Sequence, residues 1–476
     1  MKIKSNFKCN EKPSHNFAET ENANACCSLS PLIVHKLYLN RILSSWGDRT
    51  WEFATGLLLI KLYPQSLLLA AIQGILNSVA VIVFSPAIGR WIEKSPRLLE
   101  AKITLFIQNG SVIISAFFAS LYFIKDDVDS DYFDKQWITR VAPIAFVLFS
   151  VIAQVFSCGY TLVLEKDWLL ALVSNQEELT HLNAVLRRID LTCQTVAPFL
   201  VGFLTQYSEF ITASFLCGWN IVSTTAEYLI LRDIYITGPK SVREPKIVPD
   251  EHEMKIFDVD AIKEYLHQFA LPGSSFALLY LTVLGFDSVT IGFLVTNSVT
   301  ESVIGIVSLL AGMFGIFGTL IFKSGVEKIG LKKTGQLGYY LELGCVVPCL
   351  LMVYHKKSIK VFGVDLAIAL FLFGLVMSRV GLWVADLSAN QMIQTQTEKP
   401  SVIGGVQSSL NILMELLKFI LVAVFSHIDQ FWILVLISYC SLTFGTFLFS
   451  FYVNKRDDSF VAAEVAKNGD CLKNTS

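Results

Sequence analysis

Carboxylate side chains lie inside long apolar stretches of this 476-residue chain, where a membrane-spanning helix would have no water around it. Asp48 stands in the middle of the stretch 32–61, and Glu52 follows at i+4, on the same face of a helix. A charge near the centre of a spanning helix costs at least about 2.5–3.5 kcal/mol, so it normally faces a water-filled cavity or meets a cation. Asp48 therefore indicates a solute pathway through the membrane. The alternative is an ion pair with an interior arginine.

Other apolar stretches carry a further carboxylate and three amides, at Gln108, Asn109, Asn220 and Glu227. Together with Asp48 they supply two carboxylates and three amide oxygens, the ligands that hard cations such as Ca²⁺ prefer. Each amide could instead only hydrogen-bond to a neighbouring helix. Asn183 and Asp190 form a second polar pair, about two turns apart on one helix face.

The second half of the chain offers fewer candidate ligands, at Asp287, Ser288, Arg379, Asp386, Glu415 and Lys418. Glu415 and Lys418 stand at i, i+3, a spacing that favours an internal ion pair over a metal site. The sequence holds no histidine cluster suited to a transition metal. It also holds no P-loop, H-E-x-x-H pair or convincing nucleophile elbow. These observations argue against an enzyme.

The composition determines which elements must position these residues. Hydrophobic residues make up 53% of the chain and charged residues 16%, with a mean hydropathy of +0.54, which is typical of an integral membrane protein. Apolar windows of about twenty residues predict twelve spans, at 32–61, 67–90, 100–124, 138–164, 181–204, 209–232, 269–297, 300–322, 331–354, 361–388, 402–426 and 429–453. Polar residues interrupt the first, fifth and tenth windows, and we expect a site in such spans.

An even number of spans places both termini on one side of the membrane. Lys and Arg gather between spans two and three, between spans eight and nine, and after the last span, so this side is predicted to be cytoplasmic. The expected organisation is a tail, a six-helix half, a hydrophilic cytoplasmic linker, a second six-helix half and a tail, at 1–31, 32–232, 233–268, 269–454 and 455–476. Cys26 and Cys27 in the first tail could carry palmitate.

The two halves also carry similar residues at equivalent positions. Glu93-Lys94 and Glu327-Lys328 follow equivalent spans, Asp48 corresponds to Asp287, and the pair Asn183 and Asp190 corresponds to Asn411 and Lys418. Three matches in the same order indicate parallel six-helix repeats. This is the arrangement of major-facilitator transporters, which handle their substrate near the midplane of the membrane.

Five segments then make the chain recognisable. In order along the sequence they are the stretch 45–54 (SWGDRTWEFA), 183–190 (NAVLRRID), 284–287 (LGFD), 379–387 (RVGLWVADL) and 405–411 (GVQSSLN). With these motifs, which span nearly the whole membrane region, the chain resembles the ferroportins, the iron exporters of solute carrier family 40. The resemblance implies an all-α membrane protein of the major-facilitator type. It also implies a plasma-membrane location.

The resemblance further implies a function and a set of ligands. The expected function is export of Fe²⁺ from the cytosol by alternating access, with Co²⁺ and Zn²⁺ as surrogates, protons as counter-ions and no prosthetic group. The family's first-half iron site matches Asp48 and Asp190, and we add Glu52 and Asn183 as neighbouring candidates. The family's Ca²⁺-binding set matches Asp48, Gln108, Asn109, Asn220 and Glu227, which are all present here.

The chain departs from the family in its second half. Vertebrate ferroportins carry a Cys and a His at the positions of Ser288 and Lys418, and a His at the position of Glu52. A protonated lysine repels a divalent cation, so the second-half metal site is expected to be weakened or absent, unless Lys418 serves as a fixed charge in place of the metal. The hormone hepcidin engages that Cys in vertebrates, so we expect no hepcidin-type control. We expect a monomer.

Two other functions stay open at this point. The missing Cys and His, with an aromatic lining at Trp46, Trp51, Trp219 and Trp383, suit a facilitator of an organic cation or a small polar solute. The Ca²⁺ ligands are all present, whereas the second-half metal site lacks the Cys and the His. This combination would suit a Ca²⁺-responsive membrane protein that transports nothing.

Overall fold

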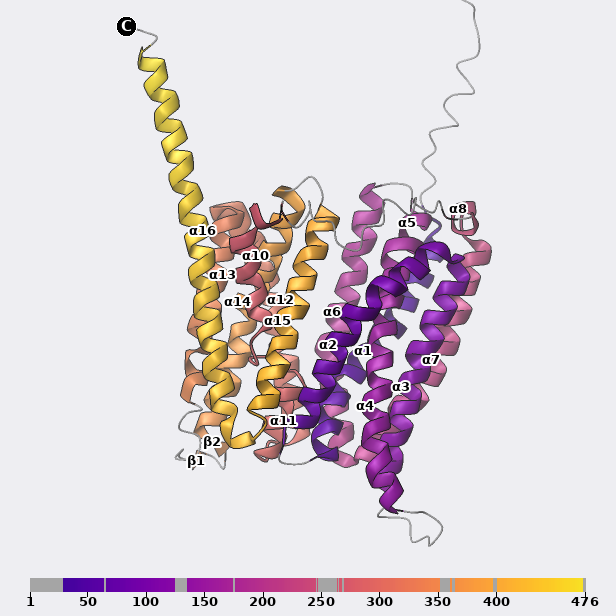
Figure 1. The fold of residues 1–476 in the computed structure, drawn as a ribbon. Helices are drawn as coiled ribbons and strands as arrows, with labels where there is room; N and C mark the ends of the chain where they lie inside the picture. Colours follow the sequence, from indigo (N-terminus) through magenta and orange to yellow (C-terminus); the bar gives the residue numbers. More distant parts are fainter. Residues whose placement is uncertain are drawn as a thin grey trace, which may run out of the picture.

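The computed structural model describes residues 29–63, 66–124, 135–173, 176–244, 246, 263, 265–267, 269–351, 360–361, 364–396 and 400–473. Cys26, Cys27 and most of the predicted linker at 233–268 lie outside these residues. The described chain is almost entirely helical. Its helices form two groups that lie side by side, the first coloured from indigo to pink and the second from red through orange to yellow in Figure 1.

The first group contains the six predicted spans. They are α1 (Pro31–Leu62), α2 (Leu68–Lys94), α3 (Arg97–Ile124), α4 (Lys135–Leu162), α6 (Gln176–Tyr207) and α7 (Glu209–Thr237). Helix α4 continues through a π-helical turn (Val163–Trp168) into the short α5 (Leu169–Leu172), and α8 (Lys240–Arg243) follows α7. Trp168 is fully buried in the apolar cluster that joins these elements within the first half.

The second group contains the other six spans. They are the pair α10 (Ala270–Tyr280) and α11 (Ser288–Thr296), then α12 (Glu301–Ile329), α13 (Leu331–Val346), α14 (Leu366–Gln396), α15 (Pro400–Val424) and α16 (Phe431–Lys473). Two short strands, β1 (Lys360–Val361) and β2 (Val364–Asp365), pair antiparallel before α14, and a 3₁₀ turn (Ile428–Gln430) precedes α16. Helix α16 continues well past the predicted start of the tail at 455.

Seven described helical segments are long and apolar enough to cross a membrane by length and composition alone. Helices α1 and α6 do not meet this criterion because of their polar residues. They are nevertheless continuous, as is α14, although polar residues interrupt the hydropathy of all three. The helix break falls in the seventh span instead, between α10 and α11, which the sequence pattern did not indicate.

Side chains from distant helices satisfy the backbone at this break. Arg379 of α14 donates to the carbonyl oxygen of Leu284, and the hydroxyl of Ser438 in α16 accepts from the amide of Val283 at 2.9 Å. Asp287 caps α11 by accepting from the amide of Thr290 at 3.1 Å. Since unpaired backbone groups are costly inside a membrane, an irregular segment persists there only with such partners.

The two halves meet toward the end of the bundle where α1 ends and α7 and α12 begin, which we call the distal end (lower in Figure 1). Helix α6 packs on α12, α2 on α15, and α1 on α11. The backbones of α6 and α12 touch near Gly202 and Gly305. A Cβ atom on Gly305 would lie 2.6 Å from the carbonyl oxygen of Pro198. The amide of Leu67 donates to the carbonyl oxygen of Ser426 at 3.1 Å, and this bond also joins the halves.

Glycine packing between α13 and α14 yields a first prediction. A Cβ atom on Gly381 would lie 2.6 Å from the carbonyl oxygen of Gly338, and backbone atoms cannot rotate away. We expect Gly381→Ala to lower the midpoint of thermal unfolding by several degrees, because overpacking typically costs about 1–3 kcal/mol. Fluorescence-detected size-exclusion after heating measures this midpoint.

Gly344→Ala on α13 is the matched control, since a Cβ atom there meets nothing within 4 Å. Equal unfolding midpoints for the two variants would contradict this account of the helix pair.

Candidate functional site

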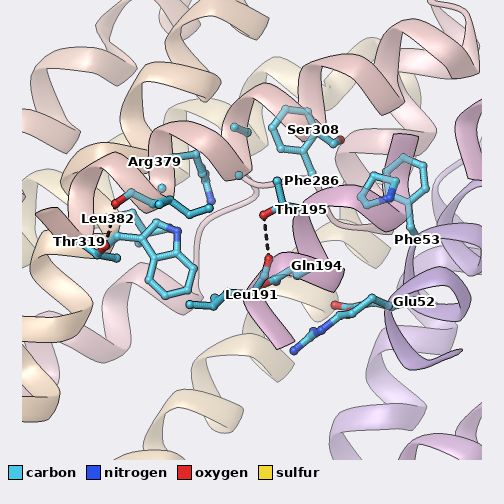
Figure 2. Close-up of a pocket in the computed structure, with 17 residues that line it drawn as sticks. Glu52, Phe53, Leu191, Gln194, Thr195, Phe286, Ser308, Thr319, Arg379 and Leu382 are labelled. Carbon is cyan, nitrogen blue, oxygen red and sulfur yellow. Dashed lines mark hydrogen bonds and ion pairs between the residues drawn. The ribbon is translucent and has the colours of Figure 1, made fainter. Parts of the chain in front are cut away.

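A cavity of about 250 Å³ lies between the two halves. Helices α1 and α6 line it on one side, and α12, α14 and Phe286, in the break of the seventh span, line it on the other (Figure 2). Its polar lining includes Arg49, Glu52, Thr195 and Arg379. A cavity bordered by both halves, with charged groups from each, has the position and the polarity of a transport pathway.

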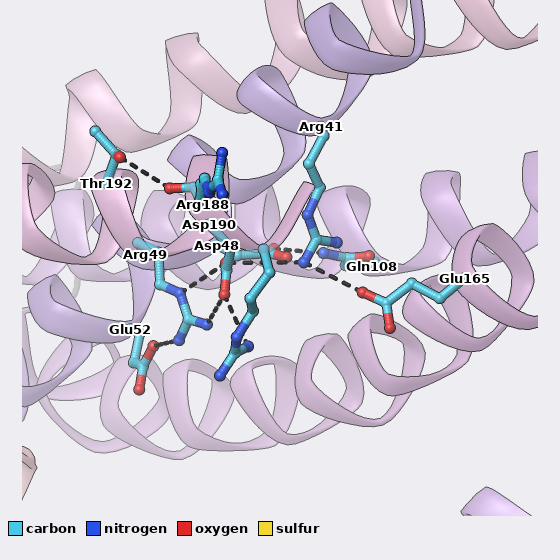
Figure 3. A network of polar contacts seen from close by, with 10 residues as sticks. Arg41, Asp48, Arg49, Glu52, Gln108, Glu165, Arg188, Asp190 and Thr192 are labelled. Atoms are coloured by element: carbon cyan, nitrogen blue, oxygen red, sulfur yellow. Dashed lines mark hydrogen bonds and ion pairs between the residues drawn. The ribbon is translucent and has the colours of Figure 1, made fainter. Parts of the chain in front are cut away.

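Asp48 lies in the middle of α1, next to this cavity's lining residue Arg49, and is half-buried. Its Oδ1 accepts a hydrogen bond from Nε2 of Gln108 in α3 at 2.6 Å (Figure 3). This neutral amide is the only hydrogen-bond partner of the Asp48 carboxylate among the described residues. The sequence left an ion pair with an interior arginine as the alternative for Asp48, and the described part of the chain forms no such pair within 4.0 Å of it.

Asp190 of α6 differs from Asp48 because it is buried and surrounded by cationic side chains. Only 4% of it is exposed. Arg49 of α1 donates to both of its oxygens, at 3.2 and 2.8 Å, and Arg187 lies 3.3 Å from Oδ2. Arg41 reaches Oδ1 at 3.9 Å (Figure 3). Three guanidinium groups therefore neutralise this carboxylate, and a metal ion could use it as a ligand only after Arg49 has moved.

Glu52 offers Arg49 a second partner. Its carboxylate lies 2.7 Å from the same guanidinium, and 66% of its side chain is exposed. It lines the cavity between the halves (Figure 2). Arg49 therefore bridges the buried Asp190 and the exposed Glu52, which provides a route along which the guanidinium could transfer from one to the other.

The structure brings only some of the predicted Ca²⁺ ligands close to one another. Asp48 and Gln108 are in contact, and Oδ1 of Asn220 lies 3.7 Å from a Cβ atom placed on Gly47, next to Asp48. Asn109 is buried on α3. Glu227 instead accepts hydrogen bonds from Ser223 on its own helix and from Tyr160 of α4.

Two buried side-chain oxygens in this region lack a protein hydrogen-bond partner in the described part of the chain. Oε1 of Gln108 and Oδ1 of Asn40 are buried and have no hydrogen-bond partner among the described residues. Asn40 donates through its amide to Tyr160 at 3.1 Å, so it belongs to the network that holds Glu227. Because a buried acceptor without a partner is costly, these two oxygens suit a water molecule or a cation.

No group of three or more His, Cys, Asp or Glu side chains within the described ranges is placed to hold a metal ion. Asn183 lies in α6, but its side chain is outside the described part of the chain. A metal ion in the first half would therefore need amide, hydroxyl, backbone or water oxygens beside Asp48.

Lys418, one of the two positions at which the resemblance predicts a second-half metal site, forms an ion pair. Nζ of Lys418 in α15 lies 3.0 Å from Oδ2 of Asp287, and only 7% of Lys418 is exposed. Glu415 is 3.8 Å from the same ammonium, so the predicted i, i+3 pair forms but the contact with Asp287 is shorter. Ser288 is the first residue of α11, and its Cα is 3.0 Å from a Cβ atom placed on Gly56 of α1.

Sequence reasoning missed two of the three arginines that neutralise Asp190, Arg41 and Arg49, whereas Arg187 stands at the local i, i+3 spacing. Arg49 lies 141 positions from Asp190 in the chain, and no local spacing relates them. The signal was available in part, because Arg41 and Arg49 lie inside the same apolar stretch as Asp48. An interior arginine predicts a buried acidic partner, although it does not say which one.

Comparison with known proteins now identifies the family. Residues 32–442 match the family model described as Ferroportin1. The chain belongs to the ferroportin family. This ferroportin is 28% identical to mouse ferroportin over 92% of its own length and 94% of the relative's. It is 26% identical to solute carrier family 40 member 1 of Arabidopsis thaliana, with 92% and 90% covered.

Solved structures confirm the predicted fold. A bacterial homologue of the iron transporter ferroportin in an inward-facing state has a TM-score of 0.72 at 23% identity, covering 89% of this chain and 98% of the other. The outward-facing form of a bacterial homologue has a TM-score of 0.62 at 23% identity, covering 89% and 99%. The xylose transporter XylE has a TM-score of 0.55 at 11% identity, covering 87% and 96%. The all-α major-facilitator fold is therefore confirmed, and this ferroportin is a multi-pass membrane transporter rather than an enzyme.

The buried pair of Lys418 and Asp287 yields a second prediction. Removing one partner of a buried ion pair is strongly destabilising, typically by about 3–5 kcal/mol, because the other charge is left without compensation. We expect Lys418→Met to lower the thermal unfolding midpoint more than the double substitution Lys418→Met with Asp287→Asn does. Fluorescence-detected size-exclusion again measures the midpoint. A double variant less stable than Lys418→Met would contradict the pair.

Proposed function

We propose that this ferroportin exports Fe²⁺ from the cytosol by alternating access, and that Asp48 is its principal metal ligand. One observation carries the proposal. Among the described residues, Asp48 has only the neutral amide of Gln108 as a hydrogen-bond partner, whereas Asp190 and Asp287 are already paired with cationic side chains. A carboxylate without a counter-ion in the middle of a span attracts a cation. Co²⁺ and Zn²⁺ are expected to follow the same route.

Asp190 takes part in the proposed cycle through Arg49. When a divalent ion approaches Asp48, its charge repels the guanidinium of Arg49, which can keep Glu52 as its partner at the cavity surface. Asp190 then becomes available as a second oxygen ligand, and Asn183 lies on the same helix. Protons are the proposed counter-ions, carried by Asp48, Glu52 or Asp190 when the metal has left.

Calcium is the proposed modulator of this site. Asp48 would be shared between Fe²⁺ and a Ca²⁺ set completed by Gln108, Asn109, Asn220 and Glu227. The unpartnered oxygens of Gln108 and Asn40 support a cation here. Glu227 would have to leave Tyr160 and Ser223 to join it. Calcium binding would therefore include a movement of α7 relative to α4.

In the second half, we propose that the ammonium of Lys418 takes the place of a metal ion. It neutralises Asp287 at 3.0 Å and lies 4.6 Å from the ring centre of Phe419, so a divalent cation would meet a fixed positive charge there. The transporter would then carry a single metal ion per cycle. Ser288 and its packing against α1 argue against hepcidin-type regulation.

We further propose that the protein acts as a monomer in the plasma membrane, with both termini cytoplasmic and the distal end extracellular. The gathering of Lys and Arg in the connections at the opposite end supports this orientation. Since the halves meet toward the distal end, the structure would represent the state in which the pathway is open to the cytosol.

The decisive experiment measures Co²⁺ flux into proteoliposomes that contain a metal-quenched dye. We expect Asp48→Asn to reduce the initial rate by at least about tenfold, since a loss of 1.4 kcal/mol of ion binding already changes occupancy by that factor. Asp233→Asn is the matched control, because Asp233 pairs with Lys36 away from the cavity. Equal rates for wild type and Asp48→Asn would contradict the proposal.

Metal stoichiometry tests the role of Lys418. Wild type is expected to bind a single Co²⁺ in isothermal titration, whereas Lys418→His with Ser288→Cys is expected to bind a second, because the two substitutions restore nitrogen and sulfur ligands beside Asp287. Lys418→Arg, which keeps the charge, is the control. A second site in the wild type would show that Lys418 does not exclude the metal.

A further inference from the structure

A group of three charged side chains joins the two halves at the distal end. Nζ of Lys61, in the last turn of α1, lies 3.1 Å from Glu209 and 2.6 Å from Glu301. Glu209 is the first residue of α7, in the same half as Lys61, and Glu301 is the first residue of α12, in the other half. Glu301 has only 12% of its side chain exposed.

We propose that Lys61, Glu209 and Glu301 form the gate that holds the distal end of this transporter closed. Alternating access requires the distal contacts between the halves to break in each cycle. Lys61–Glu301 is the ion pair that crosses between the halves there, among the residues that the structure describes.

The helix ends favour each of these charges. A carboxylate is stabilised at the N-terminus of a helix and an ammonium at the C-terminus, and all three residues occupy the matching end. The surrounding seam is close-packed. The hydroxyl of Ser302 donates to Gln206 of α6, and a Cβ atom on Gly202 would clash with the carbonyl oxygen of Glu301. The charged pair is therefore held at a rigid contact between α6 and α12.

The arrangement also makes opening reversible. Lys61 has one carboxylate partner in each half. When α12 moves away, Lys61 therefore keeps its ion pair with Glu209. Glu301, released at the start of α12, then meets water at a helix N-terminus, which stabilises it. Because 30% of the Lys61 side chain is exposed to solvent, the crossing pair is weak enough to break in each cycle.

Hydrogen–deuterium exchange of the full chain in lipid nanodiscs tests the gate without any metal. Opening of the distal end should raise exchange in α11 and at the start of α2, which pack against the opposite half, and lower it at the other ends of α6 and α14. We expect Glu301→Gln to shift the ratio of open to closed protein by about two- to fivefold, the range for one partly exposed pair.

Charge reversal sharpens the test. Lys61→Glu places three carboxylates together and should open the distal end further, whereas Lys61→Glu combined with Glu301→Lys recreates an attraction between the halves and should restore closure. Lys36→Glu is the matched control, because its partner Asp233, 2.5 Å away, lies in the same half. It should leave exchange in α11 unchanged.

Unchanged exchange in α11 for Lys61→Glu would overturn the gate, as would a failure of the combined variant to restore protection. A change confined to peptides that contain the substituted residues would overturn it as well, because it would indicate a local effect. The measurement does not depend on what the transporter carries. Failure of the proposed metal export would therefore leave its outcome intact.

Discussion

The cost of placing charge inside a membrane governs how this ferroportin is built. Three of the aspartates in its spans, Asp48, Asp190 and Asp287, have different partners. Arginines surround Asp190, an ammonium neutralises Asp287, and Asp48 receives only the amide of Gln108. Of these three, Asp48 is the carboxylate without an ion pair among the described residues, so it is where a transported cation is expected to bind.

In the second half, the ammonium of Lys418 in α15 neutralises Asp287, and α15 also packs on α2 of the first half. Lys418 precedes Phe419, whose ring packs directly against Gly74 of α2 in the first half. Asp287 caps α11, which packs on α1. The charge pair therefore fixes two of the elements that close the distal end. A movement of α15 relative to α11 would therefore change both the Lys418–Asp287 ion pair and the contacts of these helices with α2 and α1.

The sequence alone predicted much of this architecture. Apolar windows located all twelve spans, most of them within a few residues of the helix ends, because hydropathy is a property of consecutive residues. The break between α10 and α11 was not visible, since Arg379 and Ser438, which satisfy it, lie about 95 and 155 positions away. The same reason hid the contact of Arg49 with Asp190, which lies 141 positions away. Sequence identified the polar residues, but only the packed helices show which of them neutralise one another.

Anomalous diffraction from crystals soaked with Co²⁺ tests the central claim most directly, because it locates the ion without reference to activity. This account predicts a peak beside the carboxylate of Asp48 in the first half, and none beside Asp287, where the ammonium of Lys418 lies. A peak at Asp287, or a first-half peak that persists in Asp48→Asn, would contradict it.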